Sequence, residues 1–182
     1  MTTFYTIGHS KHPIEAFLAL LRGVGAELVL DVRTIPKSRF NPQFNTDALA
    51  KSLSGAGLGY RHMPALGGLR HRPKDAGPSP NRFWDNENFR NYADYTATAE
   101  FREGLGELRA LGRSQICVIT CAEAVWWQCH RRIITDYLIA AGETVKHVMA
   151  GGSIEDGRLT EAAVIGADGV IVYPPAQGDL LL

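Results

Sequence analysis

The sequence predicts a single three-layer α/β domain, with a mostly parallel central sheet of about five strands and helices on both faces. Short apolar runs alternate with segments of helical periodicity along most of the chain, which is typical of βαβ units. The apolar runs contain few polar residues before they end, as expected of strands covered on both faces. A chain of 182 residues is long enough to bury one continuous core, so we expect one domain over residues 1–182.

The first half of the chain alternates three predicted strands with two predicted helices. The strands cover residues 4–8, 27–33 and 58–63. Pro13 suits the first turn of the first helix, and Gly25 ends that helix. Thr46 is the expected N-cap of the second helix. Each predicted helix therefore connects two strands that should run in the same direction.

The second half begins with a long segment rich in glycine and proline, over residues 63–88, and continues with regular elements. Helical patterns over 89–111 indicate one or two helices, and an apolar run over 115–121 predicts the fourth strand. A helix over 129–142 and a fifth strand over 144–149 follow. The tail, 150–182, has no assigned place in the sheet, although its sequence is compatible with a hairpin or an edge strand.

Composition and charge narrow the functional classes. Nineteen basic residues balance nineteen acidic ones, so a polyanion site would have to be a local basic patch. Three cysteines, an odd number, and an N-terminus without a signal-peptide pattern predict a cytoplasmic protein. No apolar run approaches the roughly 20 residues of a membrane helix, so we expect no membrane partner. The sequence makes no prediction about oligomeric state.

Polar side chains follow each of the four clearest strands at its carboxyl end. In chain order they are His9 and Ser10, Asp31 and Arg33, His62, and Cys121 and Glu123. Each residue alone has an ordinary structural explanation, such as capping a turn or satisfying a buried carbonyl. Ligands of parallel sheets bind beyond the carboxyl ends of the strands, so the convergence of all four predicts one shared site.

Four ordered motifs in the chain resemble the family called domain of unknown function 488. They are "TIGHS", "LDVRTIPKS", "YRHMPALGG" and "CAEAVWWQCHR", and the resemblance covers about residues 4–147. It implies that Gly8, His9, Ser10, Asp31, Arg33, Pro36, Ser38, His62, Gly67, Gly68, Cys121, Glu123, Cys129, His130 and Arg131 occupy family motif positions, including a Cys-x-Glu and a Cys-His-Arg motif. The family name implies no reaction.

Anion recognition is the favoured interpretation of this site. Arg33 and Arg131 are expected to hold a phosphate or carboxylate, helped by Ser10, Ser38, Cys129 and His130 near a helix start. His9, Asp31, His62 and Glu123 are the candidate proton-transfer groups, with Cys121 as a nucleophile or a supporting side chain. The sequence thus predicts a hydrolase or transferase acting on a phosphate-containing small molecule, nucleotide or nucleic acid.

A thiol-dependent enzyme, similar to sulfurtransferases or cysteine phosphatases, is the first alternative, with Cys121 as nucleophile. No cofactor is predicted. Zinc ranks below the thiol interpretation, because adjacent Cys129 and His130 on one helix would point about 100° apart. Together with Cys121 and His9 these two residues could in principle supply a tetrahedral set, but the chain has no paired-cysteine knuckle.

A non-catalytic nucleotide or nucleic-acid binding module is the second alternative. The basic loop over residues 61–74 holds Arg61, His62, Arg70, His71, Arg72 and Lys74. Cations interleaved with aromatic residues can follow a nucleic-acid backbone and stack on its bases, and Phe83 and Trp84 come soon after this loop. A solvated surface loop explains the same charges equally well.

Overall fold

The computed structural model describes residues 1–175 and contains a six-stranded sheet with the order β3-β2-β4-β1-β5-β6. The strands are β1 (Thr3–Gly8), β2 (Leu28–Asp31), β3 (Gly59–His62), β4 (Cys117–Cys121), β5 (Thr144–Val148) and β6 (Ile154–Asp156). The first five run parallel, and β6 pairs antiparallel with β5. The predicted α/β class with a mostly parallel sheet is confirmed, with one strand more than the about five expected.

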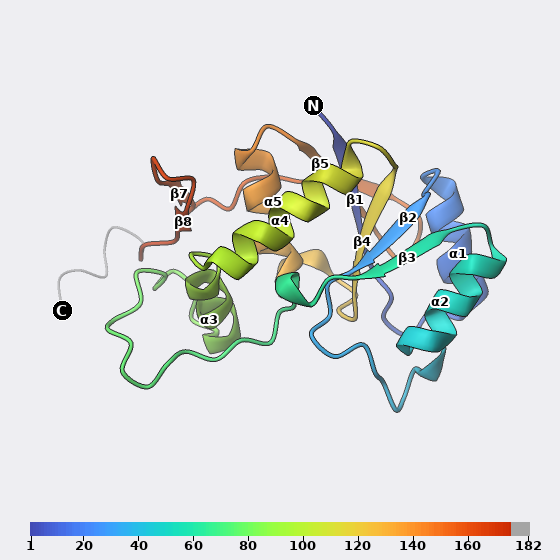
Figure 1. Cartoon of the computed structure of the whole chain (residues 1–182), viewed down its shortest axis with the longest axis horizontal. Coiled ribbons are helices and arrows are strands. Elements are labelled where there is room, and N and C mark those ends of the chain that lie inside the picture. Colours follow the sequence, from blue (N-terminus) through green and yellow to red (C-terminus); the bar gives the residue numbers. More distant parts are fainter. Residues whose placement is uncertain (176–182) are drawn as a thin grey trace.

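Helices cover both faces of the sheet (Figure 1). On one face, α1 (Ile14–Gly23) and α2 (Thr46–Gly55) pack over a core that includes Phe17, Leu49 and Val118. On the other face, α3 (Glu87–Tyr95), α4 (Ala99–Gly112) and α5 (Arg131–Ala140) pack over a second core. The 89–111 pattern, for which the sequence allowed one or two helices, therefore forms two. Among residues 1–175, no helix is long and apolar enough to cross a membrane.

Two predicted element ends differ from the structure. The predicted N-cap role of Thr46 is wrong, because Asn45 precedes the helix and Thr46 is the first residue of α2. The Thr46 hydroxyl instead donates to the carbonyl of Pro36 at 3.3 Å. The second strand ends at Asp31 and does not reach Arg33, since the chain turns there so that the Arg33 side chain can fold back onto Asp31.

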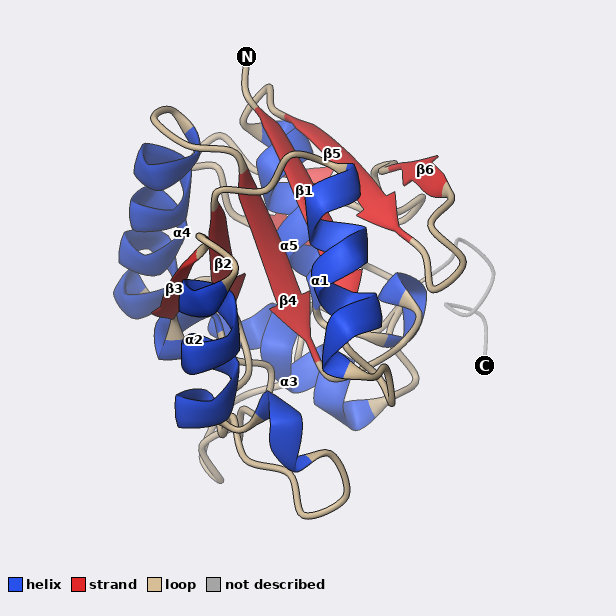
Figure 2. Ribbon diagram, turned by 90° about the vertical axis from the view of Figure 1, so that its right-hand side faces the viewer, coloured by secondary structure: helices blue, strands red, loops and turns tan. Residues whose placement is uncertain are grey.

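The tail packs against α5. Beyond β6, which Figure 2 shows beside β5, the strands β7 (Val164–Ile165) and β8 (Ile171–Val172) form a small hairpin. The Tyr173 hydroxyl donates to Asp136 Oδ2 at 2.8 Å, and the Ile171 amide donates to the Tyr137 hydroxyl at 2.9 Å. The tail, which the sequence did not place, therefore contributes an edge strand, β6, and a hairpin of β7 and β8. Its last residues, 176–182, lie outside the described residues.

The connections leave the centre of the sheet in opposite directions. Strands β1 and β4 are neighbours, but β1 leads to α1 on one face and β4 leads to α5 on the other. Such a switch in direction leaves a crevice beyond the carboxyl ends of the two strands, which is where ligands of open α/β sheets bind. The fold therefore places the best site for a ligand at the ends of β1, β2 and β4.

Candidate functional site

A cavity of about 1160 Å³ opens at this crevice. Its wall includes most of the residues expected at the site, namely His9, Ser10, Arg33, Ser38, Cys121, Glu123, Cys129 and His130. The other three expected residues, Asp31, His62 and Arg131, are absent from the wall and contact residues that form it. The structure thus brings the strand-end groups together in two layers, one lining the cavity and one supporting it.

Asp31 and Arg33 form a buried ion pair beneath the cavity. Both carboxylate oxygens of Asp31 accept from the Arg33 guanidinium, Oδ1 from Nε at 2.8 Å and Oδ2 from an Nη at 2.5 Å. The Tyr60 hydroxyl also donates to Asp31, at 2.9 Å. Burial opposes a charge on Arg33, but the bond and the negative charge of Asp31 outweigh it and raise the pKa of Arg33. Asp31 is therefore occupied as the partner of Arg33.

The remaining bonds of Arg33 tie three segments together. Its guanidinium donates to the carbonyl of Phe44 at 2.8 Å and contacts Nε2 of His9 at 3.1 Å. The imidazole of His62 bonds the Arg33 carbonyl at 2.7 Å, so His62 orients the backbone and does not reach the cavity. Within residues 1–175, four of the five guanidinium N–H groups of Arg33 thus have protein partners, and the fifth could bind a ligand.

His9 lies buried at the end of β1, stacked on the ring of Phe44 with centroids 4.1 Å apart. Its burial, and then the positive charge of Arg33, lower the pKa of His9 to about 4. At neutral pH the ring is therefore uncharged and can accept a hydrogen bond from Arg33 through Nε2. The next residue, Ser10, has a positive φ of 45°, and its amide donates to the Ala122 carbonyl at 3.0 Å.

The loop from β4 to α5 packs directly on the end of β1. Any side chain at Gly8 would overlap the carbonyl oxygen of Glu123, so only glycine permits this approach. The same carbonyl accepts from the guanidinium of Arg131 at 2.6 Å. Arg131 is almost fully buried, and its Nε donates to Cys129 Sγ at 3.3 Å. Arg131 therefore holds the shape of the loop and faces a sulfur, whereas sequence analysis expected it to face an anionic ligand.

Two cysteines, Cys121 and Cys129, lie beside each other in the cavity wall. Burial alone would raise the pKa of Cys129, but the interaction with the Cys121 thiol and nearby positive charge lower it well below its ordinary value. The same interaction with Cys129, together with burial, raises the pKa of Cys121. Sequence analysis named Cys121 as the candidate nucleophile, but of the two sulfurs it is Cys129 Sγ that accepts a hydrogen bond from Arg131 Nε, at 3.3 Å. Cys117, buried within the sheet, has a pKa raised by burial to about 11.

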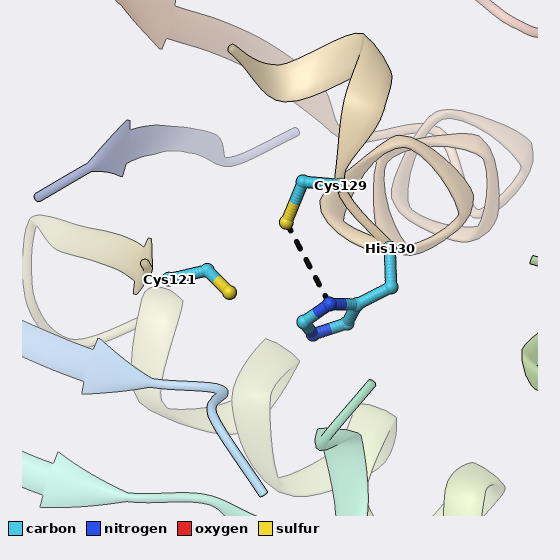
Figure 3. A group of neighbouring side chains, drawn as sticks. All are labelled: Cys121, Cys129 and His130. Carbon is cyan, nitrogen blue, oxygen red and sulfur yellow. Dashed lines mark hydrogen bonds between the residues drawn. The ribbon is translucent and has the colours of Figure 1, made fainter. Parts of the chain in front are cut away.

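His130 completes a cluster of three possible metal ligands with Cys121 and Cys129. One ligand atom from each residue lies within 4.8 Å of the others, and Figure 3 shows the three side chains pointing toward one another. The premise that Cys129 and His130 diverge on a helix is wrong. Cys129 has an extended backbone, with φ −128° and ψ 148°, and His130 is the residue before α5 begins.

Charged side chains around the cavity are predominantly basic. Lys11, Arg33 and Lys37 line it, and Glu123 is the one acidic residue in the described wall. Sequence analysis missed both lysines, although each is adjacent to a motif: Lys11 follows "TIGHS" and Lys37 lies inside "LDVRTIPKS". It also missed Asn86 and Asn88, which reach the cavity from the start of α3 and carried no motif signal.

The basic loop over residues 61–74 has most of its arginine charge compensated. Arg61 pairs with Glu107, Arg70 with Glu100 at 3.6 Å, and Arg72 with Asp94 at 2.6 Å. Of the aromatic residues after the loop, Trp84 is buried and packs against Phe83 and Phe89. This loop therefore presents no continuous row of unpaired arginines to a nucleic acid.

Comparison with known proteins identifies the family. The model of a family described as domain of unknown function DUF488 matches residues 13–138. The chain belongs to the DUF488 family. The match is shorter than the resemblance over residues 4–147, so the "TIGHS" motif precedes the matched DUF488 segment. No curated protein and no solved structure matches this chain.

The buried histidines make the stability of this DUF488 protein sensitive to acid. Like His9, His147 is buried, and burial followed by the charge of Arg131 lowers its pKa to about 4. Between about pH 6.5, the ordinary histidine pKa, and pH 4, the unfolded chain binds protons that the folded protein does not. We expect the free energy of unfolding to fall across this range, by up to about 1.4 kcal/mol per pH unit for each histidine.

Urea denaturation at a series of pH values checks this prediction. The variants His9→Gln and His147→Gln should each show a shallower dependence on pH than the wild type, because each lacks one of the two depressed groups. His71→Gln, which changes an exposed histidine, is the matched control. If neither His9→Gln nor His147→Gln reduces the slope of the free energy of unfolding against pH, the assignment of that slope to these two histidines is wrong.

Proposed function

We propose that this protein is an enzyme that binds a phosphate-bearing substrate in the strand-end cavity and catalyses its hydrolysis or group transfer. The observation that carries the proposal is the charge of the cavity wall, which combines Lys11, Lys37 and one free N–H group of Arg33 with a single carboxylate. Cationic side chains are the usual ligands of phosphate oxygens. The protein has no net charge, so the basic residues of the cavity wall provide a local attraction for an anion.

Lys11 and Lys37 take the anion-binding role in this proposal. Both are exposed at the cavity, and neither forms an ion pair within the described residues. The Arg131 guanidinium is bonded to Cys129 Sγ and to the Glu123 carbonyl, so in this proposal it shapes the site. Arg33 is paired with Asp31 and offers the substrate only its remaining N–H group. Ser10 and Ser38 add hydroxyl groups to the same wall.

Glu123 is the proposed proton acceptor. It is the carboxylate in the cavity wall, it follows the end of β4 by two residues, and the two cysteines and His130 line the same cavity. Asp31 cannot share this task while both of its oxygens accept from Arg33. His9 can move a proton only after Arg33 releases its Nε2, so it ranks second.

The lysine assignment predicts the loss of phosphate binding. Inorganic phosphate and pyrophosphate should change the fluorescence of Trp127 and Trp84, which both line the cavity. We expect Lys11→Ala and Lys37→Ala each to weaken this binding about tenfold, since a hydrogen bond to a charged group contributes about 1.5 kcal/mol. Lys51→Ala, on the outer side of α2, is the control and should leave it unchanged. Equal affinity in all three variants would refute the assignment.

The assignment of Glu123 predicts a loss of turnover without a loss of binding. Nitrophenyl phosphomonoesters and phosphodiesters are suitable test substrates. Removing a general base slows such reactions by about 100-fold or more, so Glu123→Gln should lose turnover while phosphate affinity stays within about twofold. Glu103→Gln, on the exposed face of α4, is the matched control. If the wild type binds phosphate but turns over neither class of ester, the binding-module alternative gains support over the enzyme.

A thiol-dependent enzyme is the second candidate, and the contact between Arg131 Nε and Cys129 Sγ favours it. Positive charge beside a sulfur stabilises a thiolate, and Cys129 lies in the wall of the cavity. The Cys129 thiolate would then attack the phosphorus of a phosphate ester, forming an S–P bond as the P–O bond to the alcohol breaks. The alcohol leaves and takes a proton from water, and a second water molecule hydrolyses the S–P bond.

This candidate predicts selective alkylation. In chelator-treated protein, iodoacetamide at neutral pH should modify Cys129 before Cys121, with Cys117 unmodified in the folded protein as the internal control. Peptide mass spectrometry measures the order, and turnover should decline in step with modification of Cys129. Complete modification of Cys129 with turnover intact would eliminate the thiol candidate.

A further inference from the structure

The cluster of Cys121, Cys129 and His130 has the separation that a tetrahedral metal site needs. Cys129 Sγ lies 3.6 Å from His130 Nδ1, and the ligand atoms of all three residues lie within 4.8 Å of one another (Figure 3). With a Zn–S bond of about 2.3 Å and a Zn–N bond of about 2.05 Å, tetrahedral geometry places sulfur and nitrogen about 3.6 Å apart. A small shift of the Cys121 side chain would bring its sulfur to the same separation from Cys129 Sγ and His130 Nδ1.

The surroundings of His130 fix its ring for metal binding. Nε2 lies 3.0 Å from the carbonyl oxygen of Val32, which can only accept a hydrogen bond, so Nε2 carries the proton. Nδ1 then has a free lone pair on the side of the cysteines. A hydrogen bond from the second ring nitrogen to a backbone carbonyl is the usual support of a metal-bound histidine. Gly68 packs against the ring so closely that any side chain there would overlap it.

The charges and the softness of the ligands favour zinc. Two thiolates and an imidazole suit Zn²⁺, and the two negative sulfurs balance its charge. Arg131 donates to Cys129 Sγ at 3.3 Å, which gives the sulfur a supporting hydrogen bond from outside the cluster. His9, the fourth ligand of the set that the sequence allows, is directed elsewhere, because its Nε2 contacts Arg33.

We propose that Cys121, Cys129 and His130 bind a zinc ion whose fourth coordination position opens into the strand-end cavity. All three residues line that cavity. Among the described residues, they supply three metal ligands. Three protein ligands with one open position are typical of catalytic zinc, whereas structural zinc is closed by four. Metal binding does not depend on the proposed function, but the role of the ion does: it would polarise a phosphate oxygen or activate a water molecule beside Glu123.

Metal content and cobalt spectroscopy test the site in the full chain, after removal of any affinity tag. Elemental analysis should find about one zinc per chain. After a chelator removes it, one equivalent of Co²⁺ should produce the visible absorption of a tetrahedral ion and a sulfur-to-cobalt charge-transfer band. Cys121→Ser, Cys129→Ser and His130→Ala should each weaken Co²⁺ binding at least tenfold. Cys117→Ala and His71→Ala are the matched controls and should retain both bands.

A second measurement keeps the test valid if a ligand variant fails to fold. In the wild type, one equivalent of Zn²⁺ should slow alkylation of Cys121 and Cys129 by iodoacetamide at least tenfold. Wild-type protein that binds no Co²⁺ at stoichiometric concentration, or whose two thiols react equally fast with and without Zn²⁺, would overturn the proposal. The outcome is independent of phosphate binding: zinc bound without any effect of Lys11→Ala or Lys37→Ala on phosphate would support the metal site and reject the proposed function alone.

Discussion

The buried ion pair between Asp31 and Arg33 is the constraint on which the rest of the site depends. Withdrawing two charges from water costs several kcal/mol for each ion, and only a fully bonded pair recovers that cost. Here the carboxylate accepts from Arg33 and Tyr60, and the guanidinium also reaches Phe44 and His9. One interaction thereby fixes the ends of β1, β2 and β3 relative to the segment before α2. The floor of the cavity is preorganised because Asp31 and Arg33 cannot separate without leaving a buried charge unpaired, and the other groups are hydrogen-bonded to this pair.

The second half of the site depends on an equally tight contact, between Gly8 and the carbonyl of Glu123. This approach allows the loop after β4 to cross over the end of β1, and Arg131 clamps the same carbonyl from the other side. Cys129 and His130 then lie between the loop and α5, with Val32 and Gly68 holding the imidazole. The β2 end therefore contributes to both halves, through Arg33 on one side and the Val32 carbonyl on the other.

Much of this arrangement follows from the sequence, because parallel strands deliver their carboxyl ends to one edge. That rule is sufficient to bring His9, Arg33, Cys121 and Glu123 together without knowledge of the strand order. It does not reveal that Arg33 bends back onto Asp31, because either residue could equally face solvent. The backbone angles at Cys129 were also beyond sequence reasoning: helical periodicity continues through "CHRR", yet α5 begins only at Arg131, and this difference turns two diverging side chains into a convergent pair. Lys11 and Lys37 occupy loops without periodicity, where only adjacency to a motif marks them.

The topology gives the two halves of the site different chemical characters. Loops after β1 and β2 lead toward the layer of α1 and α2 and carry the ammonium groups of Lys11 and Lys37 and the hydroxyl of Ser38. The loop after β4 leads toward α5 on the opposite layer and carries two sulfurs, an imidazole and a carboxylate. A phosphate ester that spans the crevice would have its charged oxygens on the first side and its reacting bond near the second. In the proposed function, this division would separate substrate binding from chemistry at the point where the connections change direction.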